Sequence, residues 1–519
     1  MNEKTTGVVP KRLIGIFAML VACFALWGVL NNMTDNLVPA FQKIFTMDQS
    51  RAGLVQVAFY GAYAVLAIFA SILIEEFSYR KGVLVGLGVY IIGALLYIPA
   101  CVMQSFDIYF VAIFVVAGGC SLLETACNPY VLALGDESTA VRRLNFAQMF
   151  NPVGSILGIF MAKELILAHL NPATTEERMA MAPDALAEIV RSELFWVCAP
   201  YVGLCAIAAA IWLFFLIGAK RHETETATDP SAAAWPKFRR VIMAAAFSLV
   251  PLTALYFAFP EMDKVLWVVC GIGGPLAYVL LMPQYREMLA TLLKTPRYFC
   301  GVVAQFFYVG VQIAAWTWMN AYCQQEFGYM GMTKDSAAGY YLCAIIVFVV
   351  CRWITTGLMK KFNPASMMAL FAAGAIASCA GVMWLPTKVI FTAFGLPFSA
   401  NILCLIAMSG FMSLMFPTIY GIALGGLDSR AVKLGAAGLI MAILGGAVIT
   451  PWMASIMGDA GTAWTKLVPS AATLWNTDLK LSSATIRAAF AIPAICFAVV
   501  LAYALLFSKN NTAKKGETK

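Results

Sequence analysis

The sequence predicts an all-α membrane protein, and two observations support this. Only 12% of the 519 residues are charged and 61% are hydrophobic, whereas roughly a quarter of the residues of a soluble domain are charged. Apolar runs of about 20 residues, enough to cross a hydrocarbon core about 30 Å thick, recur along the chain. Because lipid offers the backbone no hydrogen-bond partners, each run must form a helix. We therefore expect a chain that crosses the lipid bilayer many times.

The first six runs predict a six-helix half that occupies residues 1–219. The first run follows Lys11 and Arg12 and resembles a secretory signal, but it continues to Leu30 with no soluble domain behind it, so we expect it to be a span. The expected helices lie near residues 13–36, 53–74, 82–103, 108–134, 143–169 and 196–219.

A central segment, residues 220–297, separates this half from a second one. It begins with a polar linker at 220–240 and continues with two apolar runs that predict a transmembrane hairpin at about 241–283. The second half, residues 298–519, comprises six helices and a short tail. The helices are expected near 298–322, 337–361, 366–386, 400–425, 433–456 and 485–507. The sequence thus predicts 14 helices, or 12 if the hairpin does not span.

The basic residues predict the orientation. The net charge of +8 comes from lysines and arginines scattered between apolar runs, which indicates membrane orientation rather than binding to nucleic acid. The short loops on one side carry Arg80 and Lys81, Arg142 and Arg143, Lys360 and Lys361, and Arg430 and Lys433. The positive-inside rule places these loops, and both termini, in the cytoplasm.

Several classes of site are absent from the sequence. The 14 cysteines are mostly single residues within apolar runs, which predicts neither a disulfide framework nor a zinc site. The only histidines are His169 and His222, so we expect no metal centre, no histidine relay and no catalytic residues. No phosphate-binding glycine loop is present, so the sequence predicts neither an ATP-driven pump nor a cofactor.

Glu124 is the strongest functional candidate. It lies near the middle of the run from Ile108 to Leu134, and a carboxylate at this depth is too short to reach either membrane surface. Burial disfavours the charged form, so such a group can take up a proton and release it when water arrives. Asn128 follows four residues later on the same helical face, and Pro129 then frees a backbone carbonyl. We expect Glu124 to carry protons.

A second acidic residue, Asp35, ends the first span. Asn31, Asn32 and Asp35 share one helical face, and a solvated helix end is the alternative interpretation of Asp35. Lys163 and Glu164 in the fifth span can pair or reach the membrane surface, and their role stays open.

Polar and aromatic residues within two other spans suit the binding of a sugar. Sugar hydroxyls need amide and hydroxyl partners, and the apolar face of the ring needs an aromatic surface. Amides within apolar helices also serve as packing contacts between helices, so this alternative stays open. The fifth span supplies Asn145, Gln148 and Asn151, and the seventh core span supplies Gln305, Tyr308, Gln312, Trp316 and Asn320 at helical spacing.

Four segments resemble one known family. They are Asn31–Asp35, Leu123–Pro129, Asn145–Asn151 and Phe411–Thr418, and they are similar to the L-fucose:proton symporter family of the major facilitator superfamily. The resemblance covers both halves and implies two six-helix halves, with the hairpin as an addition, that work by alternating access.

The resemblance also implies roles for individual residues. Asp35 and Glu124 match the two acidic positions associated with proton coupling, and Gln148 and Asn151 match polar positions in the cavity. The stretch 304–316 resembles fucose permeases more than transporters of glucose, galactose or N-acetylglucosamine. The expected partners are therefore a proton and L-fucose or a related sugar, for a monomer in a bacterial inner membrane.

Two departures and two alternatives remain. Thr34 stands where fucose permeases commonly have asparagine, and Ser71, Glu75 and Ser78 replace the usual residues of the superfamily's loop motif. The alternatives are an uncoupled facilitator or a proton symporter for another sugar, and, from a different class, a membrane-embedded enzyme.

Overall fold

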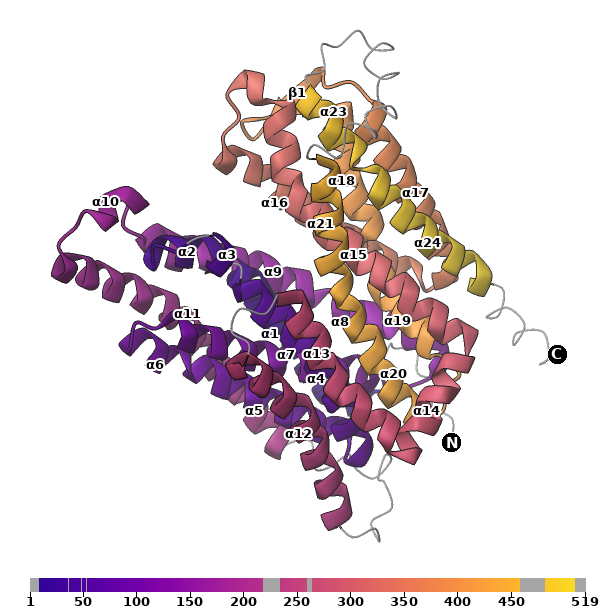
Figure 1. Ribbon diagram of the computed structural model, residues 1–519. Helices are drawn as coiled ribbons and strands as arrows, with labels where there is room; N and C mark the ends of the chain where they lie inside the picture. Colours follow the sequence, from indigo (N-terminus) through magenta and orange to yellow (C-terminus); the bar gives the residue numbers. More distant parts are fainter. Residues whose placement is uncertain are drawn as a thin grey trace. The chain divides into compact units, whose positions relative to one another are not determined.

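The computed structural model describes residues 9–35, 37–47, 49–52, 54–217, 234–258, 264–457 and 481–508. Nearly all of these residues are helical, which confirms the predicted all-α class (Figure 1). Within the described residues, 13 helices are long and apolar enough to span a membrane. The predicted hairpin forms two helices, of which the first contains the candidate span Trp235–Leu255 and the second the shorter apolar stretch Gly271–Leu281. This agrees with the predicted 12 to 14 helices.

The contacts group the chain into two compact units. The first comprises Met1–Arg143, Phe150–Lys294 and Gly426–Met441, and the second comprises Leu144–Met149, Thr295–Gly425 and Ala442–Lys519. Two short segments thus lie with a unit other than that of their chain neighbours. The domain boundaries expected after residues 219 and 297 follow the course of the chain and stay a prediction.

The first unit contains most of the helices drawn from indigo to magenta in Figure 1. Its helices are α1 (Ile14–Asp35), α2 (Leu37–Ile44), α3 (Gln49–Ala52), α4 (Leu54–Glu76), α5 (Tyr79–Leu95), α6 (Tyr97–Val102), α7 (Phe106–Ala133), α9 (Phe150–Met161), α10 (Thr175–Met179), α11 (Pro183–Ile217), α12 (Ala234–Ala258), α13 (Lys264–Leu281), α14 (Pro283–Lys294) and α20 (Ser429–Met441). Helix α8 (Ala140–Gln148) begins in this unit and ends in the second.

The second unit adds one small sheet to its helices. Its elements are α15 (Pro296–Glu326), α16 (Lys334–Leu358), α17 (Pro364–Trp384), β1 (Val389–Ala393), β2 (Leu396–Ser399), α18 (Ala400–Met412), α19 (Met415–Leu424), α21 (Gly445–Met457), α23 (Leu481–Ala488) and α24 (Ala491–Ser508).

Short turns occur in both units. The 3-10 turns cover Lys11–Leu13, Glu137–Thr139, Leu167–His169, Gly328–Met330 and Ala442–Leu444, and Ala162–Ile166 is a π-helical turn.

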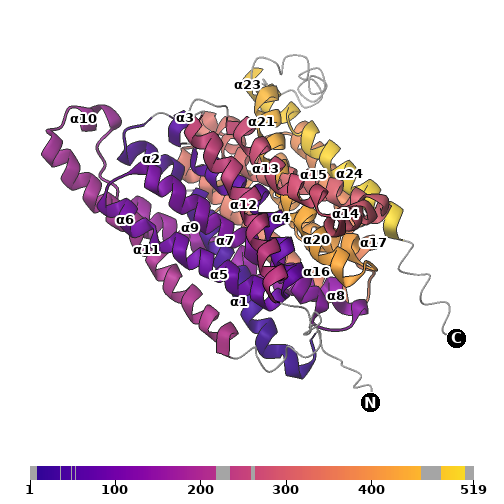
Figure 2. The same cartoon turned by 60° about the horizontal axis from the view of Figure 1, so that its bottom comes forward.

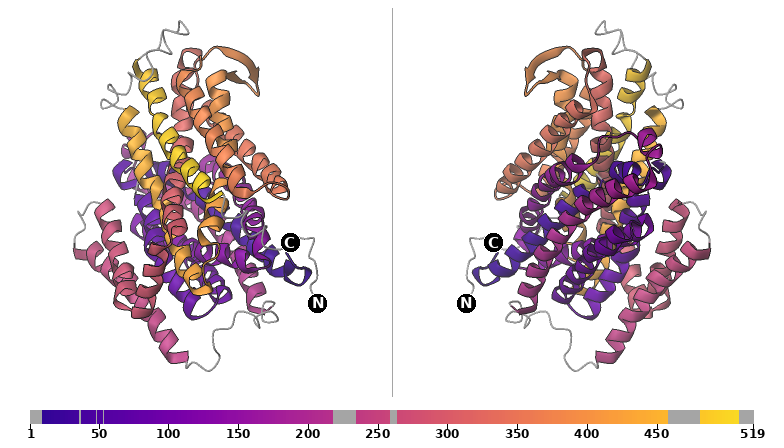
Figure 3. Two further views of the ribbon diagram at one scale, coloured as in Figure 1. Left: turned by 90° about the vertical axis from the view of Figure 1, so that its right-hand side faces the viewer. Right: turned by 90° about the vertical axis from the view of Figure 1, so that its left-hand side faces the viewer.

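The sequence predicted no strands, but β1 and β2 pair as an antiparallel hairpin, drawn as orange arrows in Figure 3. The connecting turn needs two residues with positive φ, and Phe394 and Gly395 adopt φ values of 53° and 75°. Such a two-residue turn matches the twist of paired strands.

Several spans expected as continuous helices are interrupted, and in the fifth and tenth core spans a proline explains the break. In a helix each carbonyl accepts a hydrogen bond from the N–H four residues later, and proline has no N–H. The expected helix 143–169 breaks at Met149, between α8 and α9, three residues before Pro152. The expected helix 400–425 breaks at Ser413 and Leu414, just before Pro417. The carbonyls of Gln148 and Ser413 are the ones that these prolines leave free.

Helices α1 and α9 approach each other closely in the first unit because glycines line their contact. A Cβ added at Gly28 would lie 2.2 Å from the Asn151 carbonyl oxygen. A Cβ at Gly154 would lie 2.1 Å from the Ala25 oxygen, and one at Gly158 would lie 2.3 Å from the Val29 oxygen. Two glycines four residues apart are a common device for close packing of membrane helices. This contact places Asn151 against α1.

We expect Gly158→Leu to lower the free energy of unfolding by about 2 kcal/mol, because the new side chain would overlap the backbone of α1. Thermal unfolding of the purified protein in detergent measures this. Gly203→Leu is the matched control, since Gly203 is exposed and a Cβ there meets no atom within 4 Å. Equal unfolding temperatures for the two variants would contradict the expected contact.

In the central insert, α12 to α14, the helices α12 and α13 pack on α4 and α14 packs on α20, all in the first unit (Figures 2 and 3). The insert is anchored at Glu76, which is only 6% exposed. Arg240 of α12 binds this carboxylate with both ends of its guanidinium group, with 2.7 Å from Nε to Oε1. Tyr285 and Gln284 of α14 also donate hydrogen bonds to Glu76. Burial and this carboxylate raise the pKa of the Tyr285 phenol, which therefore stays a donor.

The neighbouring carboxylate, Glu75, has a different set of partners. Arg430 Nε lies 2.6 Å from Glu75 Oε1, and Lys433 Nζ lies 3.3 Å from Oε2. Both basic residues belong to α20, which packs on α4 and α14. The end of α4 thus holds two buried carboxylates, one bound to α20 and the other to the insert.

Arg240→Leu should destabilise the protein by about 2 kcal/mol, because a buried carboxylate then loses its cation. Chemical or thermal unfolding in detergent measures the loss. Arg239→Leu removes the exposed arginine next to it and should have little effect. Similar losses in both variants would show that the ion pair is not what anchors the insert.

Candidate functional site

Glu124 lies deep in the first unit, on α7. Its side chain is 6% exposed, and α7 packs between α4 and α5. Among the described residues, no lysine or arginine lies within 4.0 Å of its carboxylate. A charged carboxylate without a cation is costly in such a place, so the arrangement favours a group that is neutral when buried.

Tyr63 of α4 is a neighbour of Glu124 that sequence reasoning missed. Its hydroxyl lies beside the Glu124 carboxyl group, the Asn31 amide and the Cys120 thiol. Neither the Tyr63 hydroxyl nor Asn31 Oδ1 makes a hydrogen bond of regular geometry, although both atoms are buried. A phenol inside an apolar run usually finds a polar partner, and this was the available signal. The Tyr63 hydroxyl therefore offers an unsatisfied polar position beside Glu124.

The other amides predicted for the first unit mostly bond to the backbone. Asn128 Nδ2 donates to the Glu124 carbonyl at 2.9 Å, and Asn32 Nδ2 donates to the Gly28 carbonyl at 3.2 Å. Asn151 Nδ2 donates to the Phe24 carbonyl at 3.4 Å, across the contact between α9 and α1. The Asp35 side chain lies outside the described part of the chain, so its predicted place beside these residues stays a prediction.

Three other residues singled out in the sequence, Thr34, Lys163 and Glu164, have polar partners. Thr34 is buried, and its hydroxyl lies 3.0 Å from the Tyr201 hydroxyl. Lys163 Nζ lies 3.6 Å from Glu164 Oε1 within the π-helical turn, and both side chains are well exposed. The pair considered for Lys163 and Glu164 is therefore present.

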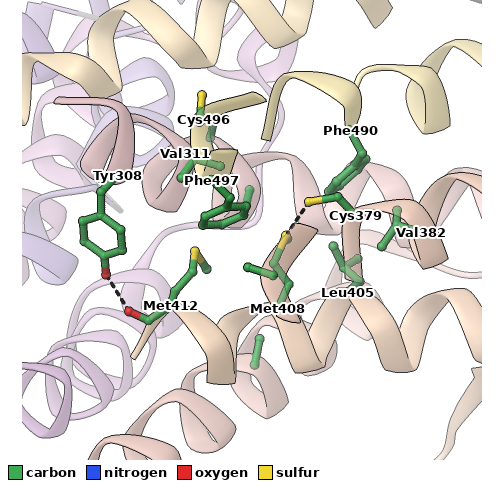
Figure 4. Close-up of a cluster of buried hydrophobic side chains, with 14 of the residues drawn as sticks. Tyr308, Val311, Cys379, Val382, Leu405, Met408, Met412, Phe490, Cys496 and Phe497 are labelled. Atoms are coloured by element: carbon green, nitrogen blue, oxygen red, sulfur yellow. Dashed lines mark hydrogen bonds between the residues drawn. The ribbon is translucent and has the colours of Figure 1, made fainter. Parts of the chain in front are cut away.

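The predicted stripe on α15 lies in the second unit. The Tyr308 hydroxyl donates to the Met412 carbonyl at 2.9 Å (Figure 4). Trp316 Nε1 lies 3.1 Å from Ser409 Oγ, and Gln312 is half-buried. Gln305 is fully buried, and neither its Nε2 nor its Oε1 has a hydrogen-bond partner. An unpaired buried amide is costly unless water or a ligand completes it.

Gln148 and Asn151, three residues apart in the expected fifth span, lie on either side of a helix break. The break at Met149 places Gln148 with the second unit and Asn151 with the first. Arg352 of α16, which sequence reasoning also missed, donates to the Gln148 carbonyl at 2.9 Å. The signal was a charged residue within the expected span 337–361. In the described part of the chain, no three His, Cys, Asp or Glu side chains could together hold a metal ion.

The model of the Major Facilitator Superfamily matches residues 13–450. The chain belongs to the major facilitator superfamily. This is a superfamily of transporters, so the prediction of a transporter rather than an enzyme is confirmed.

Individual members of the superfamily are similar over nearly their full length. The "L-fucose-proton symporter" of Haemophilus influenzae is 34% identical, over 97% of this chain and 98% of the relative. The "Glucose/galactose transporter" of Brucella abortus is 24% identical, over 95% and 93% of the two chains. A crystal structure of the fucose:proton symporter FucP from E. coli has a TM-score of 0.69 and 28% identity, over 95% and 98%. The expected family and major facilitator fold are confirmed.

We expect Gln305→Leu to raise the stability of the ligand-free protein by about 1–2 kcal/mol, because leucine fills the site without unpaired polar atoms. The unfolding temperature in detergent measures this gain. Gln325→Leu, an exposed position on the same helix, is the control and should change little. A destabilised Gln305→Leu variant would indicate that the amide already has partners in the ligand-free protein.

Proposed function

We propose that the chain is a proton-coupled symporter that imports L-fucose or a closely related hexose or deoxyhexose. The observation that carries the proposal is Glu124, a buried carboxyl group with no cation within reach among the described residues. The names of similar transporters support the coupling to protons and the sugar class.

In this proposal the Glu124 proton sets when the transporter can change state. The carboxyl group takes up a proton from outside, with Asp35 as an accessory acid, and sugar then binds. The neutral group can pass through a closed, dry intermediate at a lower cost than a carboxylate. Water then reaches the group from the other side, and both proton and sugar leave. The open positions at Asn31 Oδ1 and Tyr63 suit a rearrangement of hydrogen bonds around this proton.

The sugar is proposed to bind amide and aromatic side chains within the spans. The proposed residues are Asn31, Asn32, Asn128, Gln148, Asn151, Gln305, Tyr308, Gln312 and Trp316. The unpaired amide of Gln305 supports this, because sugar hydroxyls can satisfy both its donor and its acceptor. Loss of the hydroxyl group from the exocyclic CH2OH of a hexose leaves a methyl group, for which Trp316 offers an apolar surface.

The proposed setting is a bacterial inner membrane with both termini in the cytoplasm. The transporter would act as a monomer, driven by the proton gradient without a cofactor. The alternative is another sugar, such as glucose or galactose, or transport without proton coupling. Two observations are the reason to test several sugars. The chain is similar to a glucose/galactose transporter, and the Thr34 hydroxyl already has a partner in the Tyr201 hydroxyl.

A panel of sugars tested on reconstituted vesicles separates these possibilities. L-fucose should alkalinise the external medium as protons enter with it, more strongly than galactose, glucose or N-acetylglucosamine. Sugar uptake without alkalinisation would mean a facilitator. The strongest response to another sugar would replace L-fucose as the substrate.

Glu124→Gln should abolish sugar-driven proton influx and concentrative uptake, because the amide cannot exchange a proton. Uptake of labelled L-fucose against its gradient and the external pH are the measurements. Glu164→Gln is the control, since this carboxylate is exposed and should not be needed. Normal proton-coupled accumulation by the Glu124→Gln variant would refute the role of Glu124.

A further inference from the structure

Two proline-freed carbonyls of the second unit meet at one arginine. Arg352 Nε donates to the Ser413 carbonyl, and Nη1 donates to the Gln148 carbonyl at 2.9 Å. These are the carbonyls four residues before Pro417 and Pro152. In a membrane a freed carbonyl needs a partner from within the protein. Arg352 supplies this partner for both helix breaks.

The surroundings of Arg352 explain how a buried cation is tolerated there. The residue is 3% exposed, and its guanidinium carbon lies 4.5 Å from the centroid of the Phe348 ring. Within the described residues, no carboxylate lies within 4.0 Å of it. The C-terminal ends of helices carry partial negative charge, and α8 and α18 both end at this group. A planar guanidinium group can serve two such ends at once.

We propose that Arg352 is the positioning residue for Gln148 in the sugar site, an inference that rests on the proposed function. By holding the end of α8 it fixes the Gln148 side chain on the unit that contains Gln305, Tyr308 and Trp316. The Phe348 ring beneath Arg352 also packs edge-on against Trp316, with 5.2 Å between ring centroids. Arg352 acts through Gln148 and needs no contact with the sugar.

A second contact ties the same end of α8 to the same helix break. Asn145 Nδ2 donates to Thr418 Oγ1 at 3.3 Å, and Thr418 Oγ1 donates to the Leu414 carbonyl at 2.6 Å. These contacts account for the grouping of Leu144–Met149 with the second unit, while α9 groups with the first. The contacts therefore group Gln148 of the fifth span with the second unit and Asn151 with the first.

The kinetic test uses Arg352→Lys. This change keeps the positive charge, but the single lysine nitrogen replaces the guanidinium group that donates to two carbonyls. The KM for L-fucose-driven proton influx should rise about tenfold, as expected for the loss of one charge-assisted hydrogen bond. Gln148→Ala should add little in the double variant, because both changes remove the same contact with sugar. Thr355→Ala is the control on the same helix, where the hydroxyl bonds only carbonyls of α16. An unchanged KM for Arg352→Lys, or fully additive effects with Gln148→Ala, would overturn the proposal.

A stability test needs no sugar and so remains decisive if L-fucose is not the substrate. Arg352→Leu should lower the unfolding temperature of the full chain in detergent, because both carbonyls lose their donor. Pro152→Ala and Pro417→Ala restore the backbone N–H groups, so the two together should recover most of that loss. Pro200→Ala in α11 is the control and should recover none. No loss in Arg352→Leu, or equal recovery by Pro200→Ala, would refute the role of Arg352.

Discussion

The structure depends on one constraint, which is that a hydrocarbon interior gives no hydrogen bonds to a polar group. The constraint makes every apolar run a helix, and it also governs where helices may break. At two helix breaks Arg352 donates hydrogen bonds to the carbonyls that lack a partner within the helix. Arg143 does the same at the end of α7. The Arg143 guanidinium is fully buried and donates to the carbonyls of Val131, Leu132 and Asp136. At these three places an arginine of the chain completes the irregular backbone.

The same constraint gives meaning to polar atoms that remain unpaired. The Tyr63 hydroxyl, beside the Glu124 carboxyl group, and Asn31 Oδ1 have no regular hydrogen bond, and both amide atoms of Gln305 are unpaired in the second unit. A rigid packing role would have been served better by apolar side chains. Unpaired groups of this kind lower the stability of the empty protein and favour the state that has its ligands bound.

The sequence was sufficient for features that depend on a single segment. Hydropathy located the spans and the hairpin, and the depth of Glu124 within its run singled it out as a buried carboxyl group. Features that depend on contacts between distant segments were missed. Tyr63 and Arg352 matter because of neighbours on other helices, which spacing along one helix cannot reveal. The helix break at Met149 was also missed, because the apolar run that predicts the fifth span continues through Pro152. Phe394 and Gly395 form the hairpin turn from a residue pair that carries only a weak turn signal.

The anchoring of the insert at Glu76 has an evolutionary consequence. A buried acid at the end of α4 is tolerable only while Arg240, Tyr285 and Gln284 are present, and all three belong to the insert. A lineage that deleted the insert would keep a buried charge without a partner unless Glu76 were also replaced by a neutral residue. In a lineage that acquired the insert, an acidic residue at this position would stabilise the contact between the insert and α4. An acidic residue at the position of Glu76 should therefore covary with the presence of the two additional membrane helices. This one position of a sequence alignment would distinguish transporters that have the insert from those that lack it.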